Sequence, residues 1–98
     1  MELEDLKNVK LKGLVDDIEN GQELLDAMKS LGYFAQIDFV HGNASYTVYC
    51  SDCKHCKNWC VTYEDDSDEP PKDTWYETID ELLLNHRLLD GTHILDVL

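Results

Sequence analysis

The chain has 98 residues, of which 43% are apolar, and it carries 21 Asp and Glu against 8 Lys and Arg, a formal net charge of −13. This size and composition predict one small acidic domain over residues 1–98 with a packed core, and they argue against a large enzyme with an enclosed substrate cavity. The charge disfavours direct binding to nucleic acid or to anionic membranes, because both repel an acidic protein and no stretch rich in Lys and Arg offsets that repulsion.

The first third of the chain has the apolar spacing of helices. Apolar residues recur at intervals of three and four in two sets, which Asn20-Gly21 separates. The sets are Leu11, Leu14, Val15 and Ile18, and then Leu24, Leu25, Met28 and Leu31. This spacing predicts two helices, or one kinked helix, ending at Gly32, because glycine readily adopts the left-handed conformation that ends helices. Residues 2–9 fit either a turn of helix or an edge strand.

The middle of the chain has the composition of a sheet. Residues 33–40 and 46–50 are rich in aromatic and branched side chains and flank the turn signal Gly42-Asn43, which predicts a hairpin. Residues 59–63 predict a third strand, reached through a connection over residues 51–58. Residues 64–73 contain six carboxylates, two prolines and no large apolar residue, which predicts a loop.

The end of the chain predicts helix again. Thr78 precedes Ile79-Asp80-Glu81, an acidic first turn that predicts the beginning of a helix, and residues 88–98 close the chain around Asp90-Gly91. The predicted fold class is therefore α+β, a three-stranded antiparallel meander with N-terminal and C-terminal helices packed on one face.

The cysteines form a dense run with the spacing Cys-x2-Cys-x2-Cys-x3-Cys, made of Cys50, Cys53, Cys56 and Cys60. Bacterial ferredoxins have this spacing, but Val61 stands where they have proline, and no second run completes the clusters. Three or four thiolates suit a tetrahedral zinc ion, and His41 and His55 are further candidate ligands.

Two other interpretations of the cysteines stay open. Cys53, Cys56 and Cys60 share one face of a helical turn, and Cys50 and Cys60 fit inward positions on paired strands, so packing explains the run as well as metal binding does. A thiol-redox protein is the third interpretation, since Lys54 and Lys57 would lower the pKa of neighbouring thiols.

The sequence contains no recognisable catalytic arrangement. The histidines His41, His55, His86 and His93 are scattered, and order alone does not define a catalytic triad. The glycines stand singly, whereas phosphate-binding loops need them clustered. We therefore expect a protein that is not an enzyme.

The carboxylates are the most prominent feature of the sequence. They could simply keep a small domain soluble. Alternatively, carboxylates on a rigid sheet and loop could reproduce the field of a phosphate backbone and occupy the basic groove of a nucleic-acid-binding protein. The candidate partner-binding residues are first Glu64, Asp65, Asp66, Asp68 and Glu69, and second Asp16, Asp17 and Glu19.

The C-terminal residues Trp75-Tyr76-Glu77-Thr78-Ile79-Asp80-Glu81-Leu82-Leu83, Leu88-Leu89-Asp90-Gly91 and Ile94-Leu95 resemble the tails of small proteins carried by phages and mobile elements. As a short acidic α+β chain, the whole profile is similar to phage-encoded inhibitors of host defence of the anti-CRISPR type. This resemblance implies a stoichiometric protein partner, plausibly a nucleic-acid-handling enzyme with a basic channel.

The sequence thus predicts a non-enzymatic acidic protein that inhibits or occludes a basic protein. The main alternative is a small zinc module built on the cysteine run, with a thiol-redox protein as a third. No apolar run approaches the roughly 20 residues of a membrane span, and the first residues are acidic where a secretory signal is basic. We therefore expect a cytoplasmic protein, in a bacterial host if the chain is phage-encoded.

Overall fold

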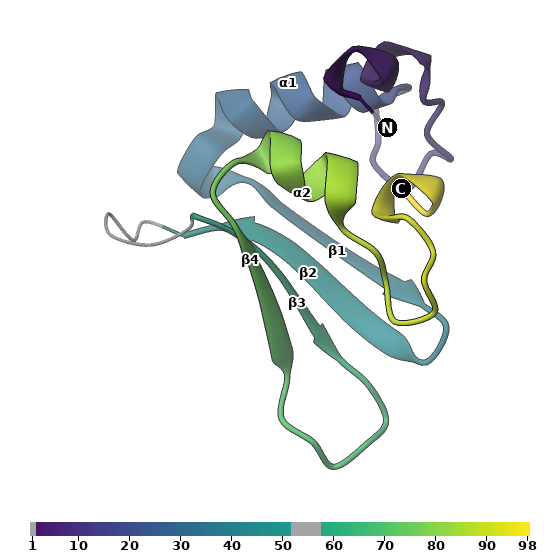
Figure 1. Cartoon of the computed structure of the whole chain (residues 1–98), viewed down its shortest axis with the longest axis vertical. Coiled ribbons are helices and arrows are strands. Elements are labelled where there is room, and N and C mark those ends of the chain that lie inside the picture. Colours follow the sequence, from purple (N-terminus) through teal and green to yellow (C-terminus); the bar gives the residue numbers. More distant parts are fainter. Residues whose placement is uncertain (1, 52–57) are drawn as a thin grey trace. The chain divides into compact units, whose positions relative to one another are not determined.

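The computed structural model describes residues 2–51 and 58–98, and the chain divides into two compact units (Figure 1). The helical unit comprises Met1–Leu31 and Ile79–Leu98, and the sheet unit comprises Gly32–Thr78. The α+β class that the sequence predicts is confirmed. That the two units form one domain, with the terminal helices on one face of the sheet, stays a prediction.

The helical unit contains two α-helices, α1 (Gly21–Leu31) and α2 (Ile79–Asn85), and two short 3-10 helices, η1 (Leu3–Asn8) and η3 (Ile94–Asp96). The side chain of Asn20 caps α1, because its Oδ1 accepts a hydrogen bond of 2.9 Å from the backbone N–H of Glu23. An ion pair of 3.1 Å joins Lys29 on α1 to Asp80 on α2. The core of this unit includes Leu6, Leu24, Leu82, Leu83, Ile94, Leu95 and Leu98.

The helix expected over residues 11–18 is absent, and this part of the prediction is wrong. Residues 11–20 form a loop that the bridge between Lys10 and Asn20 closes. Gly13 has a φ of 87° and Asp17 a φ of 65°, values that a right-handed helix does not contain. Leu14 is 49% exposed, so the apolar spacing does not produce a buried face here. The expected end of the second helix is confirmed, since α1 ends at Leu31 and Gly32 follows with a φ of 52°.

The sheet unit begins with η2 (Gly32–Phe34) and continues as an antiparallel sheet with the order β1-β2-β3-β4. The strands are β1 (Gln36–His41), β2 (Ala44–Cys50), β3 (Trp59–Glu64) and β4 (Lys72–Tyr76). Gly42, with a φ of 62°, opens the two-residue turn between β1 and β2, in the position where hairpins need a left-handed glycine. The meander is confirmed, but it has four strands and not the three expected.

The fourth strand corrects the predicted limits of the acidic loop. Lys72 and Asp73, which we expected in the loop, pair with Tyr63 and Thr62 of β3. The loop therefore comprises residues 65–71. It ends after Pro70-Pro71, because proline has no backbone N–H to donate in strand pairing, whereas the residues of β4 have one. The composition of β4 does not indicate a strand, because its first three residues, Lys72, Asp73 and Thr74, are polar, and all three are exposed.

The register gives the sheet two different faces. The core face carries large buried side chains, among them Phe39, Tyr46, Val48, Trp59 and Val61. Phe39 and Tyr46 stack across β1 and β2 with ring centroids 5.1 Å apart. The opposite face, called the polar face below, consists of Gln36, Asp38, Val40, Ser45, Thr47, Tyr49, Cys60, Thr62, Glu64, Asp73 and Trp75.

Candidate functional site

The polar face carries charged side chains of one sign in the described strands. It bears the carboxylates of Asp38, Glu64 and Asp73, all exposed to solvent. Among the described strand residues, the side chains with a basic group are His41 and Lys72, and the register places both on the core face. This arrangement follows from the two-residue period of strands, which sends alternate side chains to opposite faces. The charged side chains that the described strands place on the polar face are therefore all negative.

Asp38 is the most fixed carboxylate of the polar face. It accepts a hydrogen bond of 2.7 Å from Thr47 Oγ1 on β2 and one of 3.0 Å from Gln36 Nε2 on its own strand. These two bonds, with the bond from Thr47 first, lower the pKa of Asp38 below its ordinary value, because hydrogen bonds to the charged form favour it. Asp38 is thus a positioned anion, ready to accept further hydrogen bonds from a cation.

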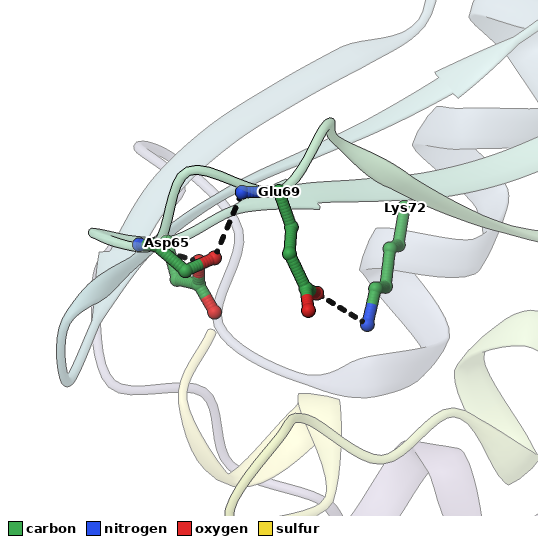
Figure 2. A network of polar contacts seen from close by, with 4 residues as sticks. Asp65, Glu69 and Lys72 are labelled. Atoms are coloured by element: carbon green, nitrogen blue, oxygen red, sulfur yellow. Dashed lines mark hydrogen bonds and ion pairs between the residues drawn. The ribbon is translucent and has the colours of Figure 1, made fainter.

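The acidic loop, residues 65–71, continues the chain beyond Glu64 at the end of β3 (Figure 2). Asp65 accepts hydrogen bonds from the backbone N–H and the hydroxyl of Ser67, and these bonds lower its pKa. The backbone N–H of Glu69 donates to Ser67 Oγ at 3.3 Å, and the Glu69 carboxylate pairs with Lys72 at 3.0 Å. The loop is therefore shaped by its own polar contacts.

The sequence placed candidate binding residues in two regions, and the structure describes them in different units. Glu64, Asp65, Asp66, Asp68 and Glu69 belong to the sheet unit, where Glu64 lies on the polar face and the others lie in the acidic loop. All of these are exposed except Asp65, which is half-buried. The second region, comprising Asp16, Asp17 and Glu19, is exposed in the loop that precedes α1 in the helical unit.

A small hollow of about 160 Å³ lies beside Glu64. Its walls supply hydroxyl groups and one carboxylate, and they comprise Ser45, Thr47, Thr62, Tyr63, Glu64 and Pro71. Hydroxyl and carboxylate oxygens accept hydrogen bonds from cations, so the hollow suits an ammonium or guanidinium group.

Aromatic side chains border the polar face at its other end. Tyr49 and Trp75 meet edge to face with ring centroids 6.1 Å apart, and Cys60 occupies the strand position between them. A hydrogen bond with Cys60, helped by burial, raises the pKa of Tyr49 to about 12, so this phenol stays neutral. Trp75 is 36% exposed and can contact a partner.

Two of the four cysteines lie in the described residues, and the register sends them to opposite faces of the sheet. Cys50 pairs with Trp59 on the core face, whereas Cys60 pairs with Tyr49 on the polar face. Burial raises the pKa of both thiols above its ordinary value, because a low-dielectric environment disfavours the charged thiolate. Cys53 and Cys56 lie outside the described residues, and so does the candidate ligand His55.

Residues 2–51 and 58–98 contain no group of three or more His, Cys, Asp or Glu that could hold a metal ion. The predicted zinc site needs residues beyond these ranges, so it stays a prediction. In the same ranges, no helix has the length and hydrophobicity that a membrane span requires.

Asp38 and Asp73 lie in the site but are not among the binding residues predicted from the sequence. Asp38 alternates with Ile37 and Phe39, and this alternation marks it as a residue on the solvent side of a strand. Its place beside Thr47 and its neighbours on β3 and β4 depends on the strand register, which alternation alone does not define. Asp73 gave no such signal because it stood in a segment expected to be loop.

Comparison of the chain with models of protein families, with curated proteins and with solved structures found no match.

Proposed function

We propose that this protein is a non-enzymatic acidic binding protein that occludes the basic, nucleic-acid-binding surface of another protein. The observation that carries the proposal is the polar face, where the described strands place the carboxylates of Asp38, Glu64 and Asp73 and no basic side chain. A face of one sign attracts a surface of the opposite sign and repels nucleic acid itself.

Rigid presentation supports imitation of a phosphate backbone. A flexible acidic tail would lose conformational entropy on binding, whereas carboxylates on a hydrogen-bonded sheet are already in place. Asp38 is held by Thr47 and Gln36, and Asp65 is held by Ser67. The acidic loop adds Asp66, Asp68 and Glu69 next to Glu64, which extends the negative surface along the chain.

The chemistry of the face favours arginine as the main contact residue of the partner. Guanidinium groups bind carboxylates through two parallel hydrogen bonds, and they also stack on aromatic rings. The face offers both contacts, with carboxylates along β1, β3 and β4 and the exposed ring of Trp75 at one end. The proposal includes the cytoplasm as the site of action, where nucleic-acid-handling partners are present and cysteines remain reduced.

The test is a competition assay with a defined basic probe. A nona-arginine peptide is bound to a fluorescent 20-base-pair DNA duplex, and the protein is titrated in while anisotropy reports release of the duplex. We expect release at low salt and a steep loss of release as salt is added, because screening weakens contacts between exposed charges.

Two variants with the same net charge identify the surface. The site variant changes Glu64, Asp65, Asp66, Asp68 and Glu69 to their amides. The control variant does the same to Glu4, Asp26, Glu77, Glu81 and Asp96, which lie outside the proposed surface. We expect the site variant to release the duplex about tenfold less effectively than the control, since five weak pairs at the surface together contribute about 1.4 kcal/mol. Equal release by the two variants would show that bulk charge, and not this surface, binds the probe.

A further inference from the structure

The two edges of the sheet differ in their openness to another strand. Proteins block exposed edges with proline, with lysine or with short strands. The edge strand β4 has all three features, since it follows Pro70-Pro71, begins with Lys72 and has five residues. The other edge strand, β1 (Gln36–His41), has six residues and contains neither proline nor lysine. In the part of the chain that the structure describes, β1 pairs with β2 alone.

The hairpin geometry defines which backbone groups of β1 point outward. His41 and Ala44 close a two-residue turn, and such a closing pair exchanges hydrogen bonds. Alternation then directs the N–H and C=O groups of Ile37 and Phe39 toward β2, and those of Gln36, Asp38 and Val40 toward the open edge. The open edge thus presents the backbone groups of three alternate residues.

The side chains beside these backbone groups suit an extended partner. Val40 is 71% exposed, although valine is usually buried in a sheet. Asp38 lies two residues before it and holds a fixed negative charge. The residues leading into β1 add an exposed aromatic pair, Tyr33 and Phe34, whose rings meet edge to face at 5.6 Å, and Phe34 is 82% exposed.

We infer that β1 is a docking edge for an extended basic segment of a partner protein, which adds to the sheet as a fifth strand. This inference rests on the proposed function and names the form in which the basic partner binds. The segment carries Arg or Lys on the side of the polar face, opposite Asp38, and its alternate side chains are apolar where they border Ile37 and Phe39. The added strand satisfies the outward N–H and C=O groups of Gln36, Asp38 and Val40.

A second copy of the chain is a poor occupant of this edge. Each copy carries a net charge of −13, so two copies repel each other. Two-fold antiparallel pairing of β1 with itself would also bring the two Asp38 carboxylates to the same or neighbouring positions, and like charges in those positions destabilise a sheet. A basic segment has the complementary charge.

Backbone methylation of a probe peptide tests the inference. The probe is a six-residue peptide of alternating arginine and valine, with blocked ends. Three N-methyl groups are placed either on the arginines or on the valines, so the two analogues have the same charge and the same number of methyl groups. Only one alternate set of N–H groups can face β1, so we expect one analogue to bind at least about tenfold more weakly than the other. Calorimetry measures both affinities.

Variants of Val40 test the edge from the side of the protein. Val40→Pro removes an outward N–H and places a ring at the edge, whereas Val40→Ala keeps the N–H. We expect Val40→Pro to bind the unmethylated probe at least about tenfold more weakly and Val40→Ala to keep the difference between the two analogues. Circular dichroism checks that both variants are folded.

The outcomes separate this inference from the proposed function. Equal binding of the two methylated analogues to the wild-type protein overturns the docking edge, even where release of DNA from nona-arginine persists. A second outcome is that the analogues differ in affinity while the site variant and the control variant release DNA equally well. That result leaves strand addition at β1 in place and contradicts the acidic loop as the binding surface. Formation of dimers that the probe peptide dissociates, seen by analytical ultracentrifugation, would overturn the basic partner in favour of a second copy.

Discussion

Asp38 and Thr47 form a hydrogen bond of 2.7 Å across β1 and β2, whereas Asp73 and Thr62, paired in the same way across β3 and β4, form no such bond in the described structure. The two pairs have the same chemistry and lie on the same face. Asp38 is therefore held more firmly than Asp73. The pair of Asp73 and Thr62 can serve as a control when the contribution of the Asp38–Thr47 bond to stability is measured.

We predict that Thr47→Val destabilises the protein by about 0.5–1 kcal/mol at neutral pH, the usual net contribution of one hydrogen bond. The bond lowers the pKa of Asp38 below 3.8, so its contribution is present above that pH and is lost as the pH falls through the lower pKa of the folded state. The cost of Thr47→Val should therefore shrink toward pH 2. Urea unfolding at pH 7 and in acid measures this, with Thr62→Val as the control that lacks the pH dependence.

The assignment of faces predicts opposite results for two adjacent residues of β1. Phe39→Ala should lower the free energy of unfolding by about 3–4 kcal/mol, because it leaves a cavity on the core face and removes the stacking partner of Tyr46. Val40→Ala should change stability by no more than about 0.5 kcal/mol, since its side chain is exposed. Denaturant unfolding of both variants checks the prediction. A large cost at Val40 would mean that the polar face is covered.

Much of the sheet could be predicted from the sequence because its pattern is local. The hairpin of β1 and β2 follows from alternating residues around Gly42, and the hairpin is found where expected. The strand β4 could not be predicted in this way, because Lys72, Asp73 and Thr74 become a strand only through pairing with β3. The apolar spacing of residues 11–18 predicts a helix that does not form, and Gly13 and Asp17 in this segment have positive φ values.

The negative charge of the candidate site could be predicted from the sequence, but the set of carboxylates that lie together on one face could not. The acidic loop is contiguous in the chain, so its carboxylates could be named directly from the sequence. Asp38 and Asp73 are far apart in the chain and come to one face only through the register of four strands. Register depends on pairing between segments, which composition does not determine.

Gly21 begins α1 where the backbone of η1 approaches closely. A Cβ atom at this position would lie 2.9 Å from the backbone oxygen of Leu6 and 3.2 Å from its Cδ2. The oxygen belongs to the backbone and cannot easily move away, so we predict that Gly21→Ala destabilises the protein by about 1–3 kcal/mol despite the better helix propensity of alanine. The control is Ser30→Ala on the exposed side of the same helix, which should change stability by no more than about 0.5 kcal/mol. Thermal or urea unfolding compares the two.

The cysteines lead to a prediction about metal content. Because Cys50 and Cys60 lie on opposite faces of the sheet, we expect them to be packed thiols and not ligands of one zinc ion. Native mass spectrometry of protein purified without chelator and under reducing conditions should then give the mass of the bare chain. An excess of one zinc per chain that chelation removes together with the fold would contradict this and favour the zinc module.

His86 should make the stability of the helical unit depend on pH. Its side chain is buried, and this burial, followed by the charge of nearby His93, lowers the pKa of His86 below 6.5. The unfolded chain therefore binds the proton more readily, so the contribution of neutral His86 is complete above about pH 6.5 and is lost as the pH falls through the lower pKa of the folded state.

We predict that the free energy of unfolding falls between pH 7 and pH 5, and that His86→Gln makes this fall shallower. Urea unfolding at several pH values measures both slopes, and an NMR titration of the wild-type His86 ring gives its pKa without a variant. The neighbouring ring of His93 is already engaged, since its Nε2 lies 2.9 Å from the carbonyl of Leu84 and its Nδ1 accepts a bond of 3.2 Å from the N–H of Leu95. A titration that places the pKa of His86 above 6.5 would contradict the prediction, because a solvated or paired imidazolium would then exist where the structure has a buried neutral ring.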